Sequence, residues 1–369
     1  MRLVMTLLVR DEEDVLDANL AFHLGQGVDF VIATDNASTD GTLEILRRHE
    51  RQGHLHLIEQ HGDLRQAEWV TRMARMAATD FGADWVINND ADEFWWPRAG
   101  TLRTVFEAIP PEVGALAAPR ARFLTPPDES EFFVDRMTYR DVRPARGAVP
   151  AHPKLAHRGL AQVTVGRSNH RIEGEGLVPV PGWHPVIIFH YPARDAARFE
   201  AKKLHHGAAL ERTLEGGSTQ VERYRQHLAG ERSLARAFAE TFVVDEAEVA
   251  AGLDDGRLVV DERLRSFFDR VPESVPGAAA VAARRGHPGP GQTAGPSTGG
   301  AGFERADMLD DLALSLKERA ELDRSAAKAQ AAVEKAARGR DRAERRLEAL
   351  RGSWLNRASR RLRSPLRRD

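Results

Sequence analysis

Cysteine is absent from this chain of 369 residues. Without thiols, the protein cannot form disulfides, attack a substrate through a thiolate or bind zinc through sulfur ligands. Neither sign of charge is in excess, because the chain contains 53 lysine and arginine residues and 55 aspartate and glutamate residues, which gives a net charge of −2. This balance favours no polyanionic partner, and we expect no binding to nucleic acid.

Long hydrophobic runs are also missing. The apolar start, residues 1–9, stops at Arg10 and Asp11, so it is too short for a secretion signal or a membrane span. No later segment approaches the roughly 20 apolar residues that a span needs. With 42% apolar residues, the chain can still bury a sizeable core. We therefore expect a soluble, cytoplasmic protein.

Apolar periodicity divides the first part of the chain into alternating strands and helices. The patterns predict strands over 3–9, 30–33, 54–59 and 85–87, and helices over 14–25, 42–51 and 66–81. This alternation is typical of an α/β fold with a mostly parallel sheet and helices on both of its faces. Ligands of such sheets bind at the carboxyl ends of the strands. Residues 10–11, 35–40, 60–63 and 90–92 would all lie there.

The pattern becomes less regular beyond about residue 110. Short strands are expected over 114–118, 161–165 and 186–189, and a charged helical region from 195 to about 270. We assign residues 1–283 to one domain with two halves, about 1–110 and about 111–283. Residues 284–302 are rich in Gly, Pro, Ser and Thr, which predicts a flexible linker.

The end of the chain is charged and contains little apolar periodicity. The composition of residues 303–352 predicts a charged helix. Leu309, Leu312 and Leu316 begin a heptad-like apolar repeat in it, which is interrupted at Asp323. The prediction therefore stays open between a solvated helix and a coiled coil through which the chain self-associates. The last 19 residues carry seven arginines against one aspartate. Within this stretch, we expect the basic tail of residues 353–369 either in solution or in peripheral contact with the inner, anionic face of a membrane.

Two aspartates separated by one residue end the buried run Trp85-Val86-Ile87-Asn88-Asn89. Asp90 and Asp92 would lie at the carboxyl edge of the sheet, where paired carboxylates suit a divalent cation that also binds phosphate. Such a cation stabilises the negative charge of a nucleoside diphosphate, so that the diphosphate can act as a leaving group. The alternative is a solvated acidic turn.

Two further strand-end loops carry polar side chains. The loop Asp35-Asn36-Ala37-Ser38-Thr39-Asp40-Gly41 suits a tight turn and a helix cap, or contacts of Asp35 or Asp40 with a base or ribose. The segment Arg10-Asp11-Glu12-Glu13 is similarly either a charged helix start or part of a ligand site.

In this order, the three motifs resemble those of a bacterial family-2-like glycosyltransferase. The resemblance is to the branch in which an Asp-x-Asp motif is followed by Glu-Phe, here Asp90-Ala91-Asp92-Glu93-Phe94. It continues through Ile188-Phe189-His190-Tyr191-Pro192-Ala193-Arg194, Phe199 and Lys202-Lys203, and so covers about residues 1–210.

The resemblance implies a nucleotide-binding sheet of the GT-A type and metal-dependent transfer of a sugar from a nucleoside diphosphate. The half up to residue 110 would then bind the nucleotide sugar, and the second half would bind the acceptor, a glycan or a lipid-linked sugar. The cofactor would be Mn²⁺ or Mg²⁺. Roles implied for single residues are metal ligation by Asp90, Asp92 and His190, and binding of the nucleotide sugar by Arg10, Asp11, Asp35, Asp40, Arg72 and Asp90.

Some of these roles have a simpler alternative. His190 is either a third metal ligand or a hydrogen-bonded core histidine. Arg72 and Arg75 either reach the diphosphate or lie on a solvated helix face. Lys154, Arg194 and Lys202 are further cations that could neutralise a leaving diphosphate.

The general base is less well defined by the sequence. An inverting transfer needs a carboxylate that removes the proton of the acceptor hydroxyl. Glu93 and, in a separate loop, Glu173 are the candidates, because the separate Glu-Asp motif of the commoner family-2 pattern has no clear equivalent here. The stereochemical outcome stays open.

Two other functions remain as alternatives. A sugar nucleotidyltransferase would usually carry a glycine-rich loop after the first strand, but residues 10–14 contain no glycine. A non-enzymatic coiled-coil assembly protein would act through residues 303–352.

Overall fold

The computed structural model describes residues 1–62, 65–129, 131–142, 152–213 and 219–286. All of them belong to the first of two compact units, Met1–Leu309. The predicted charged helix (303–352) and basic tail (353–369) lie outside the described residues, as does the predicted linker from residue 287 onward. No helix in the described ranges is long and apolar enough to cross a bilayer.

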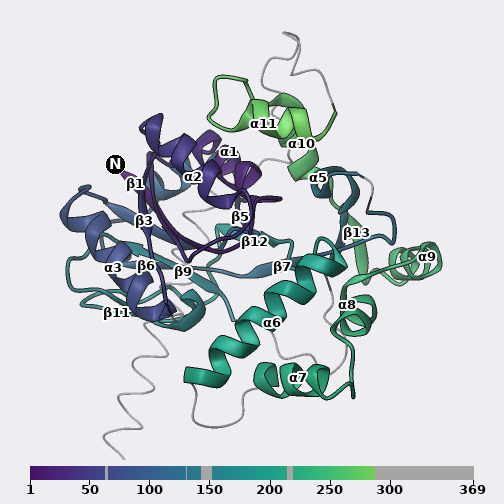
Figure 1. Ribbon diagram of the computed structural model, residues 1–369. Helices are drawn as coiled ribbons and strands as arrows, with labels where there is room; N and C mark the ends of the chain where they lie inside the picture. Colours follow the sequence, from purple (N-terminus) through teal and green to yellow (C-terminus); the bar gives the residue numbers. More distant parts are fainter. Residues whose placement is uncertain (63–64, 130, 143–151, 214–218, 287–369) are drawn as a thin grey trace, which may run out of the picture. The chain divides into compact units, whose positions relative to one another are not determined.

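The first half of the chain builds a six-stranded sheet with the order β3-β2-β1-β4-β9-β6 (Figure 1). Its strands are β1 (Leu3–Val9), β2 (Phe30–Asp35), β3 (Leu55–Glu59), β4 (Trp85–Asn89), β6 (Ala115–Ala118) and β9 (Lys154–Arg158). The first four are parallel, whereas β9 pairs antiparallel with both β4 and β6. The predicted α/β class is confirmed, and the sheet is mixed.

Helices cover both faces of this sheet. On one face, Met73 of α3 (Gln66–Thr79) accepts a hydrogen bond from the Thr34 hydroxyl of β2 at 3.1 Å. On the other face, Asn19 of α1 (Leu16–Gly25) accepts a hydrogen bond from Asn89 of β4 at 3.2 Å. The strands are therefore buried on both sides, which explains why β1 is an almost unbroken apolar run.

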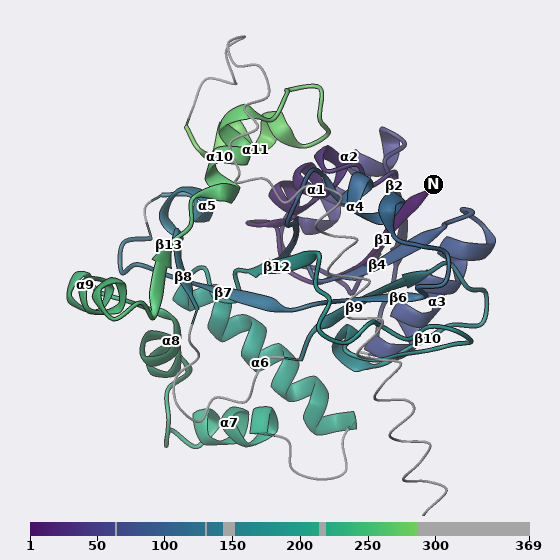
Figure 2. The ribbon, with the colours of Figure 1, turned by 180° about the vertical axis from the view of Figure 1, so that it is seen from behind.

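A second, five-stranded sheet has the order β13-β8-β7-β12-β5 (Figure 2). Its strands are β5 (Glu93–Pro97), β7 (Arg120–Leu124), β8 (Tyr139–Asp141), β12 (Val186–His190) and β13 (Leu258–Val260). Because β4 ends at Asn89 and β5 begins at Glu93, the acidic turn at residues 90–92 joins the two sheets. The cross-strand partners Glu93, His190 and Arg122 share one face of the second sheet, by the register of β5, β12 and β7.

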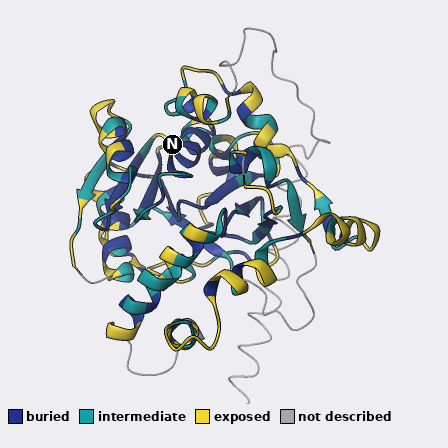
Figure 3. Cartoon of the chain, turned by 45° about the vertical axis from the view of Figure 1, so that its right-hand side comes forward, coloured by how far each residue is buried: buried dark blue, intermediate teal, exposed yellow. Residues whose placement is uncertain are grey.

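The remaining elements surround these sheets. They are α2 (Thr42–Arg51), α4 (Leu102–Ala108), α5 (Phe133–Arg136), β10 (Thr164–Val165), a 3₁₀ turn (Arg167–Asn169), β11 (Ile172–Glu173), α6 (Ala196–Thr213), α7 (Thr219–Leu228), α8 (Leu234–Phe242), α9 (Glu246–Asp254), α10 (Arg263–Arg270) and α11 (Ala278–Arg284). Figure 3 shows the central strands buried, and exposed residues on the outer turns of the helices.

Several predicted elements differ from the structure. The strand predicted over 161–165 is reduced to Thr164–Val165, and the helical region predicted from 195 to 270 is interrupted by β13. Strand β9 of the first sheet and strand β5 of the second sheet were not predicted, and neither was the second sheet as a whole. Each of these strands is five residues long and carries charged residues, which weakens the apolar pattern.

Candidate active site

The backbone of the acidic turn is fixed by one buried side chain. Asn19 of α1 is fully buried, and its amide donates hydrogen bonds to the carbonyl oxygens of Ala91, at 2.9 Å, and Glu93, at 2.8 Å. Asn89, the last residue of β4, donates back to the Asn19 side-chain oxygen at 3.2 Å. The loop that presents Asp90 and Asp92 is therefore held rigidly against α1.

The carboxylate of Asp90 is paired with a buried lysine. The ammonium of Lys154 on β9 donates to Asp90 and lies 3.4 Å from a carboxylate oxygen of Glu93, while Asn169 donates to the other oxygen of Asp90 at 3.1 Å. Lys154 is only 1% exposed. Burial works to lower the pKa of Lys154, but the charges of Asp90 and Glu93 raise it above the usual value, so the lysine stays charged.

The carboxylate of Asp92 is paired with a different lysine. Lys202 of α6 donates to Asp92 at 2.8 Å, and the imidazole Nε2 of His190 lies 3.8 Å from the other oxygen. Burial tends to raise the pKa of Asp92, but the positive charge of Lys202 holds it well below its usual range. Burial lowers the pKa of His190 to about 3. A neutral imidazole therefore faces an ionised carboxylate.

This donor set partly fits the implied metal. Carboxylate oxygens suit Mg²⁺ and Mn²⁺, and the neutral imidazole of His190 is a competent neighbouring ligand. However, in the described part of the chain no group of three or more His, Asp and Glu side chains is arranged to hold a metal ion. Asp90 faces Lys154 and Asn169, so it would have to exchange these partners to join Asp92 and His190.

The loops after β1 and β2 are bonded to one another at the same edge of the sheet. The backbone N–H of Thr39 donates to the Asp11 carboxylate at 2.6 Å, and the Asp11 N–H donates to the Ser38 hydroxyl at 3.0 Å. Arg10 donates to the carbonyl oxygen of Asn36 at 2.9 Å. Asp11 has a positive φ of 52°, a conformation that this interlocking stabilises.

Asp35 and Asp40 have different environments in the second loop. One oxygen of Asp35 accepts from the Ser38 N–H at 3.1 Å, whereas its other oxygen is buried and has no hydrogen-bond partner among the described residues. Both oxygens of Asp40 are used, by the N–H groups of Thr42 at 2.9 Å and Glu13 at 3.1 Å. Asp35 thus has an acceptor to offer a ligand, while Asp40 fixes the start of α2.

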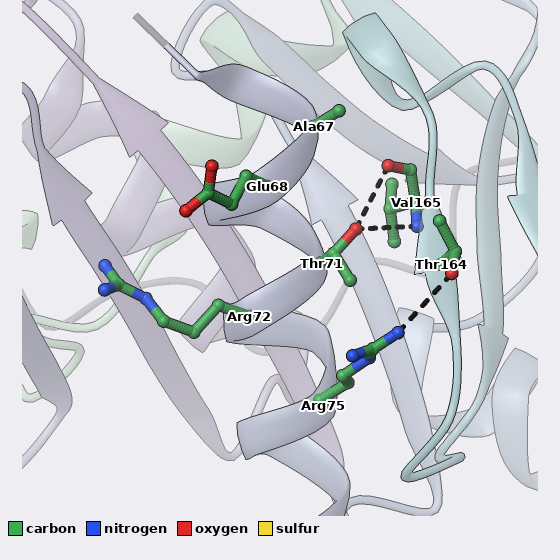
Figure 4. A pocket seen from close by; sticks show the side chains of 7 residues that line it. All are labelled: Ala67, Glu68, Thr71, Arg72, Arg75, Thr164 and Val165. Atoms are coloured by element: carbon green, nitrogen blue, oxygen red, sulfur yellow. Dashed lines mark hydrogen bonds between the residues drawn. The ribbon is translucent and has the colours of Figure 1, made fainter. Parts of the chain in front are cut away.

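Arg72 lies on the exposed side of α3. It donates to the Gln60 side chain at 3.3 Å, and Arg75 donates to the carbonyl oxygen of Val163 at 2.8 Å. Both line an open pocket of about 470 Å³ between α3 and β10, in which Arg75 points toward Thr164 and Arg72 away from it (Figure 4). None of the residues that line this pocket belongs to the acidic turn.

The two candidate bases also differ. Glu93 is 1% exposed, and burial raises its pKa to about 8, against the opposing charge of Lys154. Arg120 lies 3.5 Å from its other oxygen. Glu173 on β11 is exposed and forms an ion pair with Arg171 at 2.7 Å.

An ion network connects the acidic turn to the loop after β1, and the parts of Glu12 and Asp14 in it were not predicted. Arg194 is buried and donates to Glu12 at 2.6 Å and to Asp14 at 3.0 Å. Lys202 donates to the other oxygen of Glu12 at 2.6 Å. The sequence suggested both cations as candidates for a diphosphate, but not their pairing with Glu12 and Asp14.

Comparison with known proteins identifies one family. Residues 8–120 match the family model described as "Glycosyl transferase family 2". No curated protein matches the chain. This match begins in the last two residues of β1 and contains β2 to β6, the acidic turn and the loops after β1 and β2.

Solved structures resemble the chain only weakly. TarS of S. aureus, residues 1–349, in complex with UDP is 12% identical, with 77% of this chain and 88% of that chain aligned and a TM-score of 0.33. The same protein in complex with UDP-GlcNAc is 11% identical over 74% and 83% of the two chains, with a TM-score of 0.33. A mycobacterial protein is 16% identical over 57% and 74%, with a TM-score of 0.30.

Proposed function

Residues 8–120 are a glycosyl transferase family 2 domain, and from this premise we propose that the protein transfers a sugar from a nucleoside diphosphate sugar to an acceptor hydroxyl. The observation that carries the proposal is the meeting of three polar loops at one sheet edge. Strands β2, β1 and β4 are parallel neighbours, so the loops that bear Asp35, Asp11 and Asp90 follow the carboxyl ends of adjacent strands.

Asp35 is the proposed contact of the nucleoside. Its free carboxylate oxygen is buried beside the loop of Asp11, where a ring N–H or a ribose hydroxyl would supply the missing donor. We propose that Arg10, Asp11 and Asp40 shape this pocket through their bonds to the loop backbone. Arg72 is proposed at the rim of the site, because its partner Gln60 directly follows β3.

A divalent cation, Mn²⁺ or Mg²⁺, is the proposed cofactor. Asp92 and His190 would hold it, joined by Asp90 once this residue releases Lys154. When bound, such an ion neutralises charge on a leaving diphosphate. The residues themselves keep the site ready for it, since Asn19 fixes the turn and the pKa of Asp92 is held low enough to keep that carboxylate ionised.

The acceptor is proposed to be a glycan or a lipid-linked sugar. Either Glu93 or Glu173 is proposed as the general base that removes the proton of the acceptor hydroxyl. Single-turnover rates of Glu93→Gln and Glu173→Gln distinguish them, because loss of a general base lowers the rate about 10²- to 10⁴-fold. Glu93 could reach an acceptor only if the site opened around it, since it is 1% exposed.

The proposal is tested by thermal unfolding of the full chain with UDP, GDP, CDP and dTDP, each with and without Mn²⁺. At least one nucleotide together with Mn²⁺ should raise the melting temperature, because a ligand that binds only the native state stabilises that state. Asp92→Asn should remove the part of the shift that depends on Mn²⁺. The control is Asp254→Asn, which changes the same chemical group at an exposed position of α9. No shift with any nucleotide would contradict the proposed function.

A further inference from the structure

Lys202 is a single cation that bridges two carboxylates of the site. Its ammonium donates to Glu12 at 2.6 Å and to Asp92 at 2.8 Å. Glu12 follows β1 and Asp92 belongs to the acidic turn, so the lysine connects two strand-end loops. It comes from α6, which lies beyond the segment of residues 8–120.

The two carboxylates depend on Lys202 to different degrees. Glu12 also accepts from Arg194 at 2.6 Å, through its second oxygen. It would keep a charged partner if Lys202 moved away. Among the described residues no second cation bonds to Asp92, because the imidazole of His190 lies 3.8 Å from its other oxygen and Arg194 acts on it only through its charge, from a greater distance. Asp92 can therefore release Lys202 only when another cation takes its place.

Lys202 is placed so that it can move. Its side chain is 41% exposed, whereas the side chains of Glu12 and Asp92 are 7% and 8% exposed. The ammonium contacts the two buried carboxylates at the end of a flexible four-carbon stem. A short swing of the side chain would carry the charge off Asp92 without moving α6.

We propose that Lys202 is a tethered cation, which neutralises Asp92 while the site is empty and contacts the diphosphate of the donor once a divalent ion occupies Asp92. The charge of Asp92 is balanced by Lys202 in the empty site and by the divalent ion in the occupied site. In the occupied site, the diphosphate leaving group also contacts the ammonium of Lys202. This inference rests on the proposed function, since it requires a donor with a diphosphate.

The test measures binding rather than turnover. The Kd of Mn²⁺ for the nucleotide-free full chain is measured from the electron paramagnetic resonance signal of the free ion. Lys202→Met should tighten Mn²⁺ binding about tenfold, because a competing positive charge is gone. With saturating Mn²⁺, the same variant should bind inorganic pyrophosphate about tenfold more weakly, since a charge-assisted contact is lost. Pyrophosphate makes the second measurement independent of the nucleotide base.

Lys203→Met is the matched control. Lys203 is the same type of residue at the next position of α6, but its ammonium lies 5.3 Å from the centre of the Phe199 ring and bonds to no carboxylate in the described ranges. Its removal should change the Mn²⁺ Kd by less than about threefold, since it makes no contact with Asp92 that a bound ion would have to break. Lys202→Arg keeps the charge and should stay near the wild-type Kd, which tests the claim even if Lys202→Met does not fold.

The outcomes separate the inference from the function on which it rests. Equal Mn²⁺ affinities of Lys202→Met and Lys203→Met, with Mn²⁺ and pyrophosphate still binding to the wild type, would overturn the tethered cation and leave the proposed transferase intact. Tighter Mn²⁺ binding by Lys202→Arg would also overturn it, because charge would then not be the cause. A wild type that binds neither ligand would overturn the tethered cation, whereas the proposed transferase is overturned only if no nucleotide shifts the melting temperature.

Discussion

The side-chain amide of Asn19 donates a hydrogen bond of 2.9 Å to the carbonyl oxygen of Ala91, the residue between the two aspartates. A second hydrogen bond, to the carbonyl oxygen of Glu93, closes the turn from the other side at 2.8 Å. The geometry of Asp90 and Asp92 therefore depends on a helix that is far from them in sequence. It does not depend on the aspartates alone.

Asn19→Leu should destabilise the fold strongly. The substitution keeps the size of the side chain but leaves two buried carbonyl oxygens and the amide of Asn89 without their partner. Buried polar groups that lose a partner cost about 1–3 kcal/mol each, so a loss of about 3 kcal/mol is expected in urea unfolding. The shift in melting temperature caused by a nucleoside diphosphate and Mn²⁺ should also fall.

The matched control is Gln52→Ala. It removes a side-chain amide at an exposed position directly after α2, and should change stability by no more than about 0.5 kcal/mol. An Asn19→Leu protein as stable as the control would show that the turn is held by other contacts.

Much of the fold can be predicted from the sequence because its signals are local. The strand over Leu3–Val9 and the helix over Thr42–Arg51 have the predicted bounds, since each carries a continuous or periodic apolar pattern of its own. Strand β5 is short, and its apolar run of four residues, Phe94–Pro97, does not by itself distinguish a strand from a buried turn or helix segment. It directly follows the acidic turn, and its partner β12 lies about 90 positions later in the chain. The second sheet therefore depends on pairings that a local pattern does not contain.

The site divides in the same way. Asp35, Asp90 and Asp92 can be recognised because they directly follow or end a predicted strand. Lys154 could not be assigned its role, because its partner Asp90 is 64 positions away and no local pattern marks a buried lysine. The same holds for Glu12, whose contact with Lys202 spans 190 positions.

A pH-dependent contribution to stability is expected from His23. The ring is fully buried, accepts a hydrogen bond from the Trp95 N–H at 3.2 Å, and so must donate through Nδ1 to the carbonyl oxygen of Asn19, 2.8 Å away. Burial lowers the pKa of His23 from 6.5 to about 4. The unfolded chain therefore binds a proton at higher pH than the native state does, and stability is lost as the pH falls from about 6.5 toward 4.

This contribution is measured by urea unfolding at pH 7.5 and at pH 5. The wild type should lose about 2 kcal/mol more than His23→Gln over this interval, because glutamine can form hydrogen bonds without titrating. The comparison of the two proteins cancels the titration of the other groups. Parallel losses in both proteins would show that His23 does not cause the pH dependence.

Lys154 and Glu93 are expected to be energetically coupled. The buried ammonium of Lys154 lies between Asp90 and Glu93, so Lys154→Met removes the cation bonded to Asp90 and leaves Glu93 with Arg120 alone, 3.5 Å away. A loss of about 3 kcal/mol is expected, as for other buried charge pairs that lose one partner. Glu93→Gln in the same protein should restore part of this loss, because it removes one of the two acidic groups.

A double-mutant cycle from urea unfolding at pH 8.5 measures this coupling. The pKa of Glu93 is about 8, so at this pH a substantial fraction of the carboxyl is ionised. The two substitutions should deviate from additivity by at least about 1 kcal/mol. Effects that add within about 0.3–0.5 kcal/mol would mean that Lys154 is balanced by Asp90 alone.

Asp35→Asn is expected to weaken nucleotide binding without unfolding the protein. Asparagine keeps one oxygen for the Ser38 N–H but replaces the free acceptor with an amide, which cannot accept from a base or ribose. Loss of one such hydrogen bond should raise the Kd of the nucleoside diphosphate about tenfold. Isothermal titration in the presence of Mn²⁺ measures the change.

The control for Asp35→Asn lies at the opposite end of the same strand. Asp29 directly precedes β2 and accepts from the Leu3 N–H at 2.8 Å, at the amino edge of the sheet, away from the three polar loops. Asp29→Asn should therefore leave the nucleotide Kd within about twofold of the wild type, even if some stability is lost. If both substitutions weakened binding equally, the effect would come from a general loosening of the sheet. The free oxygen of Asp35 would then have no part in binding the nucleoside.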